Sequence, residues 1–211
     1  MIADNGKPRW SFYPGWVVSN AIAVVIAAII SWTLVSLIQN VVGETIQIGG
    51  QTHITEDFLL VYVLFPIIGV LTGLTQYFLL RHYLSHMGGW IATTILGWIM
   101  PFVVGYIYSA IITPGRDISS AWMILGLALL GACVGLPQWW LLRHRVHHAA
   151  WWILAYGFGW GMIGLLNNHT SDPFAVLLAI ATMPAISTGF VCWLLLDWLP
   201  NHELKPKAQV H

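Results

Sequence analysis

The chain has 211 residues, of which 58% are hydrophobic and only 8% are charged, and its formal net charge is zero. Soluble domains carry about 25% charged residues, so this chain has too little charge to cover a water-soluble fold. Its few basic residues also exclude a nucleic-acid-binding surface. Apolar runs long enough to cross a bilayer core of about 30 Å as helices follow one another along the chain, which predicts a multi-pass membrane protein.

Six membrane-spanning helices are predicted in chain order, near residues 15–38, 57–81, 89–112, 120–143, 150–168 and 173–199. Together they leave no room for a soluble domain, so residues 1–211 are expected to form one all-α integral membrane domain with tails at 1–14 and 200–211. Between the first two spans, alternating Thr, Ile and Gln residues around Gly49-Gly50 predict a short β-hairpin.

The basic residues predict the orientation, because cytoplasmic loops of membrane proteins are enriched in lysine and arginine. Arg116 falls on one side of the predicted topology. All the other basic residues fall on the opposite side: Lys7, Arg9, Arg81, Arg143, Arg145, Lys205 and Lys207. Both termini are therefore predicted to be cytoplasmic, and the protein is expected in the inner membrane of a bacterium.

A sequence repeat relates the second and fourth predicted spans. GVLTGLTQYFLLRHYLSHMGGW at 69–90 matches GACVGLPQWWLLRHRVHHAAWW at 131–152 with a constant offset of 62 residues. A weaker third copy lies in the last span at an offset of 54, and residues 15–23 match residues 89–97. The unit is a helical hairpin that occurs three times, at about 15–81, 89–143 and 150–199. Because all three units run in the same direction, approximate threefold symmetry about the membrane normal is expected.

The repeated phrase G-L-x-Q-W-x-x-L-R, present here as GLTQYFLLR and GLPQWWLLR, resembles a set of bacterial multi-pass membrane proteins of unassigned activity in which this phrase recurs within one chain. With the third copy, the resemblance covers most of the sequence. It implies the repeat architecture, and it implies no catalytic or binding residues.

Small residues spaced four apart recur in each copy, and this spacing lets membrane helices approach closely. They are predicted to pack the bundle together: Gly69, Gly73, Gly131, Gly135, Ala185 and Gly189. Gln76 and Gln138 lie three residues beyond such a pair and are expected to hydrogen-bond to other helices. The alternative is that both line a transport or ligand cavity. None of the predicted spans has a charged residue near its middle, which argues against a proton pump or a voltage sensor.

The predicted cytoplasmic ends of the spans form a polar and aromatic rim. Arg81, Arg143 and Asp197 occupy one register of the repeat, which suggests an ion pair between Asp197 and one or both arginines. Trp90 and Trp152 are assigned to the aromatic belt of this rim, at the level of the lipid headgroups.

Histidines at the same rim are spaced like part of a di-iron histidine box: His82, His86, His144, His147 and His148. Membrane di-iron enzymes use a further box that is missing here, and the repeat makes two of these histidines copies of two others. The favoured interpretation is that they end helices at the headgroup level, where basic groups meet anionic lipid and suit the helix dipole. No cofactor is predicted, and a bound metal, haem or pigment is the alternative.

The first functional hypothesis is a non-enzymatic membrane subunit or scaffold that contacts lipid and partner membrane proteins. Three alternatives stay open: a small transporter or ligand-binding bundle that uses Gln76 and Gln138, a histidine-box metal enzyme that acts on lipid, and a pigment- or haem-binding subunit. The sequence contains no nucleotide-binding loop and no H-E-x-x-H zinc motif.

Overall fold

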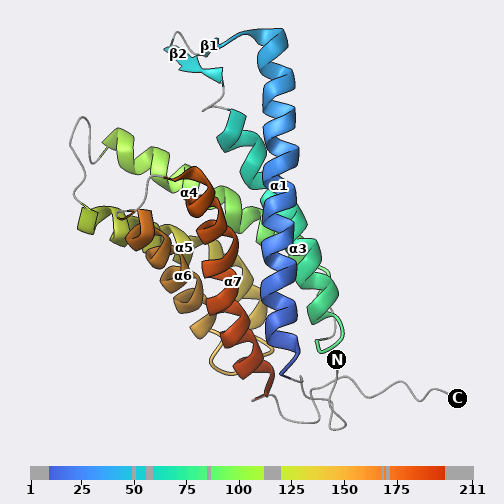
Figure 1. Ribbon diagram of the computed structural model, residues 1–211. Coiled ribbons are helices and arrows are strands. Elements are labelled where there is room, and N and C mark those ends of the chain that lie inside the picture. Colours follow the sequence, from blue (N-terminus) through green and yellow to red (C-terminus); the bar gives the residue numbers. More distant parts are fainter. Residues whose placement is uncertain are drawn as a thin grey trace, which may run out of the picture.

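A computed structural model gives the fold of the chain (Figure 1). It describes residues 10–48, 51–55, 59–84, 87–111, 120–167, 169 and 172–197. Most of these residues belong to six α-helices: α1 (Phe12–Val42), α3 (Phe65–Leu80), α4 (Trp90–Ile111), α5 (Ser120–Leu142), α6 (Trp151–Asn167) and α7 (Pro173–Asp197). The predicted all-α class is confirmed, with one β-hairpin in addition.

Within the described ranges, four helical segments are long and apolar enough to cross a membrane: Phe12–Val42, Tyr62–Leu80, Met123–Leu142 and Phe174–Asp197. A shorter apolar segment, Trp90–Pro101, lies in α4. α6 has 17 residues and is about 25 Å long, somewhat less than the bilayer core of about 30 Å. The lengths and compositions of these helices are those of a membrane protein.

The predicted hairpin is present at the end of α1. Strands β1 (Thr45–Ile48) and β2 (Gln51–Ile54) pair antiparallel, with Thr45 opposite Ile54. Gly43 ends α1 with φ of 99°, a left-handed conformation in which glycine avoids the clash of a side chain. The hairpin stands beyond the ends of α4–α7 (Figure 1).

Prolines lie in five of the helices, with Pro14 in the first turn of α1. Pro66 lies directly after the π-helical turn η1 (Leu60–Leu64), in a helical segment that runs without a break from η1 into α3. Pro101, Pro137 and Pro184 lie inside α4, α5 and α7.

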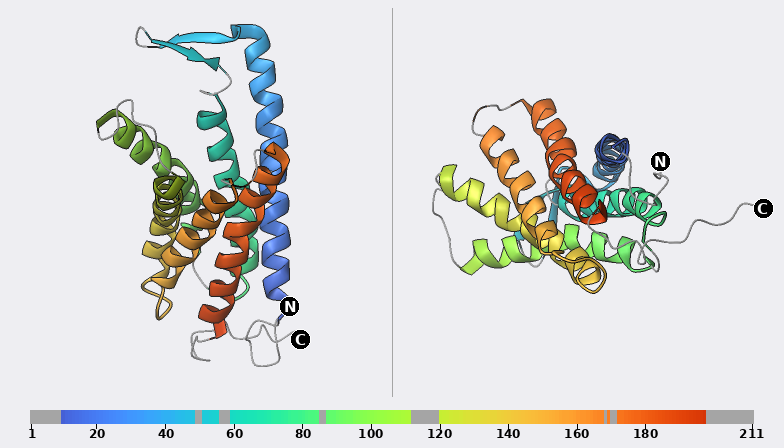
Figure 2. Two further views of the ribbon diagram at one scale, coloured as in Figure 1. Left: turned by 60° about the vertical axis from the view of Figure 1, so that its left-hand side comes forward. Right: turned by 90° about the horizontal axis from the view of Figure 1, so that it is seen from below.

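The helices contact one another in a closed ring. Each helix packs against the next in chain order, α7 packs back against α1, and α1 also contacts α3 and η1. The view along the bundle in Figure 2 shows this order of helices. Trp10 and Trp193 stack with ring centroids 4.4 Å apart, so the start of α1 and the end of α7 meet. At the opposite end, which carries the hairpin, α4 and α5 lean away from α1 (Figures 1 and 2).

The small residues predicted to pack the bundle lie at three of these interfaces. In each, a Cβ atom added to a glycine would lie under 3 Å from an atom of the other helix: Gly69 against Ile95, Gly131 against Trp160 and Gly189 against Trp16. Gly73 and Gly135 approach the following helix almost as closely, and Ala185 is buried. A larger side chain at the closest positions would push the backbones apart.

Candidate functional site

Three tryptophan indoles meet inside the bundle. Trp16 of α1, Trp90 of α4 and Trp152 of α6 are each 0% exposed. The ring of Trp152 makes T-shaped contacts with both of the others, at centroid distances of 6.0 Å to Trp16 and 5.8 Å to Trp90. This corrects the expectation that Trp90 and Trp152 belong to a lipid-facing aromatic belt. Hydropathy predicts the depth of a residue in the membrane, but it does not predict whether the side chain faces lipid or the interior of the bundle.

Two of the indoles donate to the repeated glutamines. The Trp90 Nε1–H donates to Gln76 Oε1 at 3.2 Å, and the Trp152 Nε1–H donates to Gln138 Oε1 at 2.8 Å. In both copies the tryptophan follows the glutamine by 14 residues, so each bond joins an α-helix to the next one along the chain.

The third indole bonds between the two ends of the chain. The Trp16 Nε1–H donates to Thr188 Oγ1 of α7 at 3.3 Å, and the Thr188 hydroxyl donates to the Pro184 carbonyl at 2.6 Å. The position of α7 that matches Gln138 holds Cys192, and a thiol is only a weak hydrogen-bond acceptor. The acceptor is Thr188 instead, one helical turn earlier on the same face.

The two glutamines bond to each other and to three further helices. Gln138 Nε2 donates to Gln76 Oε1 at 3.2 Å and to Thr94 Oγ1 at 2.7 Å. Gln76 Nε2 donates to Asn20 Oδ1 at 2.9 Å and to the Tyr156 hydroxyl at 3.5 Å. These five side chains come from α1, α3, α4, α5 and α6, so one connected network joins five helices.

We call this network, with the three indoles and their acceptors, the polar hub: Trp16, Asn20, Gln76, Trp90, Thr94, Gln138, Trp152, Tyr156 and Thr188. The sequence predicted an interior role for the two glutamines only. Asn20, Thr94 and Tyr156 were missed because an amide, a hydroxyl and a phenol do not align as a motif. The signal that could have found them is position, since each follows a hub tryptophan by four residues.

The hub uses the amide group of Gln76 fully. Gln76 donates twice through Nε2 and accepts twice through Oε1. Leaving a buried polar group without a partner costs about 1–3 kcal/mol, and hydrocarbon offers no replacement. The hub therefore favours one rotation of each participating helix about its own axis.

A small cavity beside Gln76 is lined by residues of α1, α3, α4, α6 and α7. Its volume is about 20 Å³, and a cavity must hold at least about 10–15 Å³ to take one water molecule. Trp98 also lines it, and the Trp98 indole packs on Trp160 at 5.6 Å between ring centroids. Within the described part of the chain, the buried Nε1–H groups of Trp98 and Trp160 have no hydrogen-bond partner.

Apolar side chains close the hub toward the loops that follow α3 and α5. Leu80, Leu142 and Leu196, the matching residues of α3, α5 and α7, are all buried. Tyr83, in the loop after α3, packs its ring edge-on to Phe12 at 5.4 Å. Burial raises the pKa of the Tyr83 hydroxyl.

The loops after α3 and α5 (residues 81–84, 87–89 and 143–150) form a surface that we call the basic rim. Arg143 Cζ lies 3.4 Å from the Trp140 ring centroid, and Arg143 Nε donates to His144 Nε2 at 3.0 Å. Arg81 Cζ lies 4.7 Å from the Phe78 ring centroid. Both arginines thus make cation–π contacts at the ends of their helices. The ion pair between these arginines and Asp197 stays a prediction.

The predicted histidine boxes are not assembled within the described residues. His82, His144, His147 and His148 are exposed, and His86 lies outside the described ranges. In those ranges, no group of three or more His, Cys, Asp or Glu side chains is placed to hold a metal ion.

In comparisons with known proteins, no family model, no curated protein and no solved structure matches this chain.

Proposed function

We propose that this protein is a non-enzymatic integral membrane subunit or scaffold that binds a partner membrane protein through the outer part of α1. The observation that carries this proposal is the length of α1 together with its apolar surface. With 31 residues, α1 is about 46 Å long, whereas the bilayer core is about 30 Å thick. Tilt alone would have to reach about 50° to contain it, and membrane helices tilt by about 0–40°.

The end of α1 is nevertheless apolar and exposed. Trp32, Leu37, Val41 and Val42 are all more than half exposed. If α1 begins at the basic rim and crosses the core in about 20 residues, the last ten or so lie outside the hydrocarbon. A largely apolar exposed surface in that position, interrupted by Thr33 and Asn40, is typical of a protein–protein contact. A partner that covers it would also reach the hairpin, whose two strands leave open edges.

The geometry of the hub favours a scaffold over the alternative of a transporter. A transport pathway through Gln76 and Gln138 requires polar groups that are available to a solute. Here both amides are already bonded to other side chains, and the cavity beside them holds about one water molecule.

We also propose that the bundle has approximate threefold symmetry, that all six helices cross the membrane together, and that the basic rim and both termini face the cytoplasm of a bacterium. Three observations support the symmetry. The three hub tryptophans occupy matching repeat positions, and a polar residue follows each of them by one helical turn. A close glycine contact also recurs between the helix of each tryptophan and the helix that precedes it in the ring. The positive-inside rule supports the orientation.

Photo-crosslinking in native membranes tests the scaffold function. A photoreactive amino acid at Leu37 or Val41 is expected to give one protein adduct of constant mass. Matched probes at Ile22 and Ile26, which are also exposed but lie nearer the middle of α1, are expected to crosslink to lipid only. A chain that gives no protein adduct at either outer position would contradict the proposal.

Solute flux tests the transporter alternative. The purified protein in liposomes is expected to pass water-sized and larger polar solutes no faster than protein-free vesicles. A flux of polar solute through the parent protein that exceeds the flux of protein-free vesicles would replace the scaffold proposal with a transporter.

A further inference from the structure

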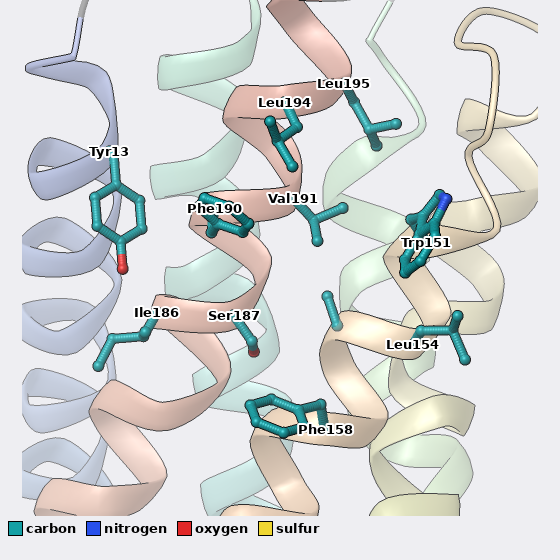
Figure 3. A pocket seen from close by; sticks show the side chains of 11 residues that line it. Tyr13, Trp151, Leu154, Phe158, Ile186, Ser187, Phe190, Val191, Leu194 and Leu195 are labelled. Carbon is teal, nitrogen blue, oxygen red and sulfur yellow. The ribbon is translucent and has the colours of Figure 1, made fainter.

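A groove of about 790 Å³ lies over the outward face of α7, between α1 and α6. Figure 3 shows Tyr13 of α1 on one side, Trp151 and Phe158 of α6 on the other, and α7 side chains such as Phe190 between them. This groove is separate from the polar hub, whose side chains point into the bundle.

Close packing of α6 and α7 ends the groove near the middle of the bundle. A Cβ atom at Gly159 of α6 would lie 2.7 Å from Pro184 Cα of α7, so the two helices touch directly at this depth. The groove lies on the rim side of this contact. A transmembrane partner helix would have to continue across the contact, whereas a ligand that reaches only to mid-membrane would not.

The depth of the groove matches one leaflet of a bilayer. On α7 it extends from Ile186 to Leu195, which is about 13 Å of helix. Half of a bilayer core is about 15 Å. The groove therefore runs from the level of the basic rim to about the middle of the membrane.

The groove suits an apolar chain. Its lining is almost entirely apolar, and the Ser187 hydroxyl bonds to the carbonyl oxygens of Met183 and Pro184 of its own helix, at 3.1 Å each. Because α7 is one of the segments long and apolar enough to cross a membrane, the groove opens toward lipid hydrocarbon.

The α6 wall of the groove leads into a loop that carries basic residues. The Trp151 backbone N–H donates to the His148 carbonyl at 3.0 Å, so the wall of the groove continues directly into the loop that carries Arg143 and Arg145. Basic side chains at this level attract anionic headgroups.

We propose that this groove binds one acyl chain of an anionic phospholipid from the leaflet on the rim side, with its phosphate at the loop of residues 143–148. The proposal rests on the function proposed above, because it presumes a membrane subunit, and it names the class of lipid that the subunit retains.

Native mass spectrometry of the full chain released from nanodiscs tests this site. The nanodiscs contain equal amounts of phosphatidylglycerol and phosphatidylcholine. The parent protein is expected to retain one phosphatidylglycerol molecule. Ile186→Trp and Leu154→Trp, on two sides of the groove, are expected to lower this retention by about fivefold or more. Leu129→Trp, at an exposed position of α5 away from the groove, is expected to retain the lipid.

The headgroup preference is tested separately. Arg145→Gln is expected to reduce the preference for phosphatidylglycerol over phosphatidylcholine while a lipid is still bound. Equal retention of both lipids by the parent protein, or full retention by both tryptophan variants, would overturn the proposal. The crosslinks from Leu37 and Val41 report on the partner contact independently, so loss of those crosslinks with lipid retained would overturn the scaffold function and leave this site standing.

Discussion

Two neighbouring layers of tryptophans in this bundle are held in different ways. In the polar hub, the indoles of Trp16, Trp90 and Trp152 each donate to a side-chain oxygen of another helix. Two turns farther along α4 and α6, Trp98 and Trp160 are almost as deeply buried, yet within the described residues their indole N–H groups have no acceptor.

The difference indicates which part of the bundle is rigid. Directional bonds across six helices fix the hub, whereas in the described part of the next layer the helices are held by ring packing and close glycine contacts. The helices also diverge beyond that second layer, toward the hairpin (Figure 1). We infer that the hub holds the fold, and that the outer half of the molecule is where a partner can reach it.

Removing a hub glutamine is expected to have the largest effect. Gln76→Leu leaves the indole N–H of Trp90 and the side-chain oxygen of Asn20 without their partner. It also removes one acceptor of the Gln138 side-chain amide. At about 1–3 kcal/mol for each unpaired buried group, the free energy of unfolding should fall by about 3 kcal/mol or more. Reversible unfolding in mixed micelles measures it. Thr33→Val, which removes an exposed hydroxyl bonded to its own helix, is the control, and equal stability of the two variants would contradict the role of the hub.

Adding one methyl group at a close helix contact is expected to have the next largest effect. A Cβ atom at Gly97 of α4 would overlap the Val134 carbonyl oxygen of α5, and overpacking of this kind costs about 1–3 kcal/mol. Gly126 of α5 has nothing within 4 Å of its added Cβ. Gly126→Ala should therefore stabilise its helix by up to about 1 kcal/mol. The same unfolding assay compares the two, and a Gly97→Ala variant as stable as Gly126→Ala would show that the second layer tolerates separation.

Exchanging tryptophan for phenylalanine compares the two layers directly. Trp90→Phe removes a hydrogen bond to Gln76, while Trp98→Phe removes a buried donor that has no partner. Both lose similar packing, so Trp90→Phe should be less stable than Trp98→Phe by about 1 kcal/mol. The reverse order of stabilities would indicate that Trp98 has an acceptor in the membrane.

The smallest expected effect is a pH dependence on the rim side of the hub. Because burial raises the pKa of Tyr83 above 10.0, the folded chain holds this proton more tightly than the unfolded chain. Its contribution to stability is complete below pH 10 and is lost as the pH rises through the pKa of the folded state. Tyr83→Phe should therefore lose less stability than the parent between pH 9 and 11. Parallel losses in both proteins would assign the alkaline effect to other groups.

The positions of the helices could be predicted from sequence because hydropathy is strong in this chain. The span predicted at 120–143 is the helix Ser120–Leu142, and the predicted hairpin is Thr45–Ile48 paired with Gln51–Ile54. The first span was predicted to end at residue 38 because Gln39 and Asn40 interrupt the apolar run, but α1 continues through them to Val42, and Gly43 ends the helix. The thickness of a bilayer limits the length of the part of a helix that crosses it, but it does not limit the length of the whole helix.

The site could be predicted only in part. Gln76 and Gln138 stand out because amides are rare inside apolar runs, and the repeat makes them equivalent. The inward direction of Trp90 could not be predicted, since tryptophan near a helix end is common at membrane surfaces. The repeat gave no sign that Thr188 accepts a hydrogen bond from a tryptophan, because its matching residues in the other copies, Thr72 and Val134, do not have this role. Such side chains take their role from their neighbours in space.

Hydrogen exchange of the indole N–H groups tests the hub most directly. In protein labelled with 15N-tryptophan and reconstituted in nanodiscs, single Trp→Phe variants assign the resonances of the two layers. The indole protons of Trp16, Trp90 and Trp152 should exchange with deuterium more slowly than those of Trp98 and Trp160, and far more slowly than that of the exposed Trp140. Hub indoles that exchange as fast as Trp140 would contradict a closed, hydrogen-bonded core.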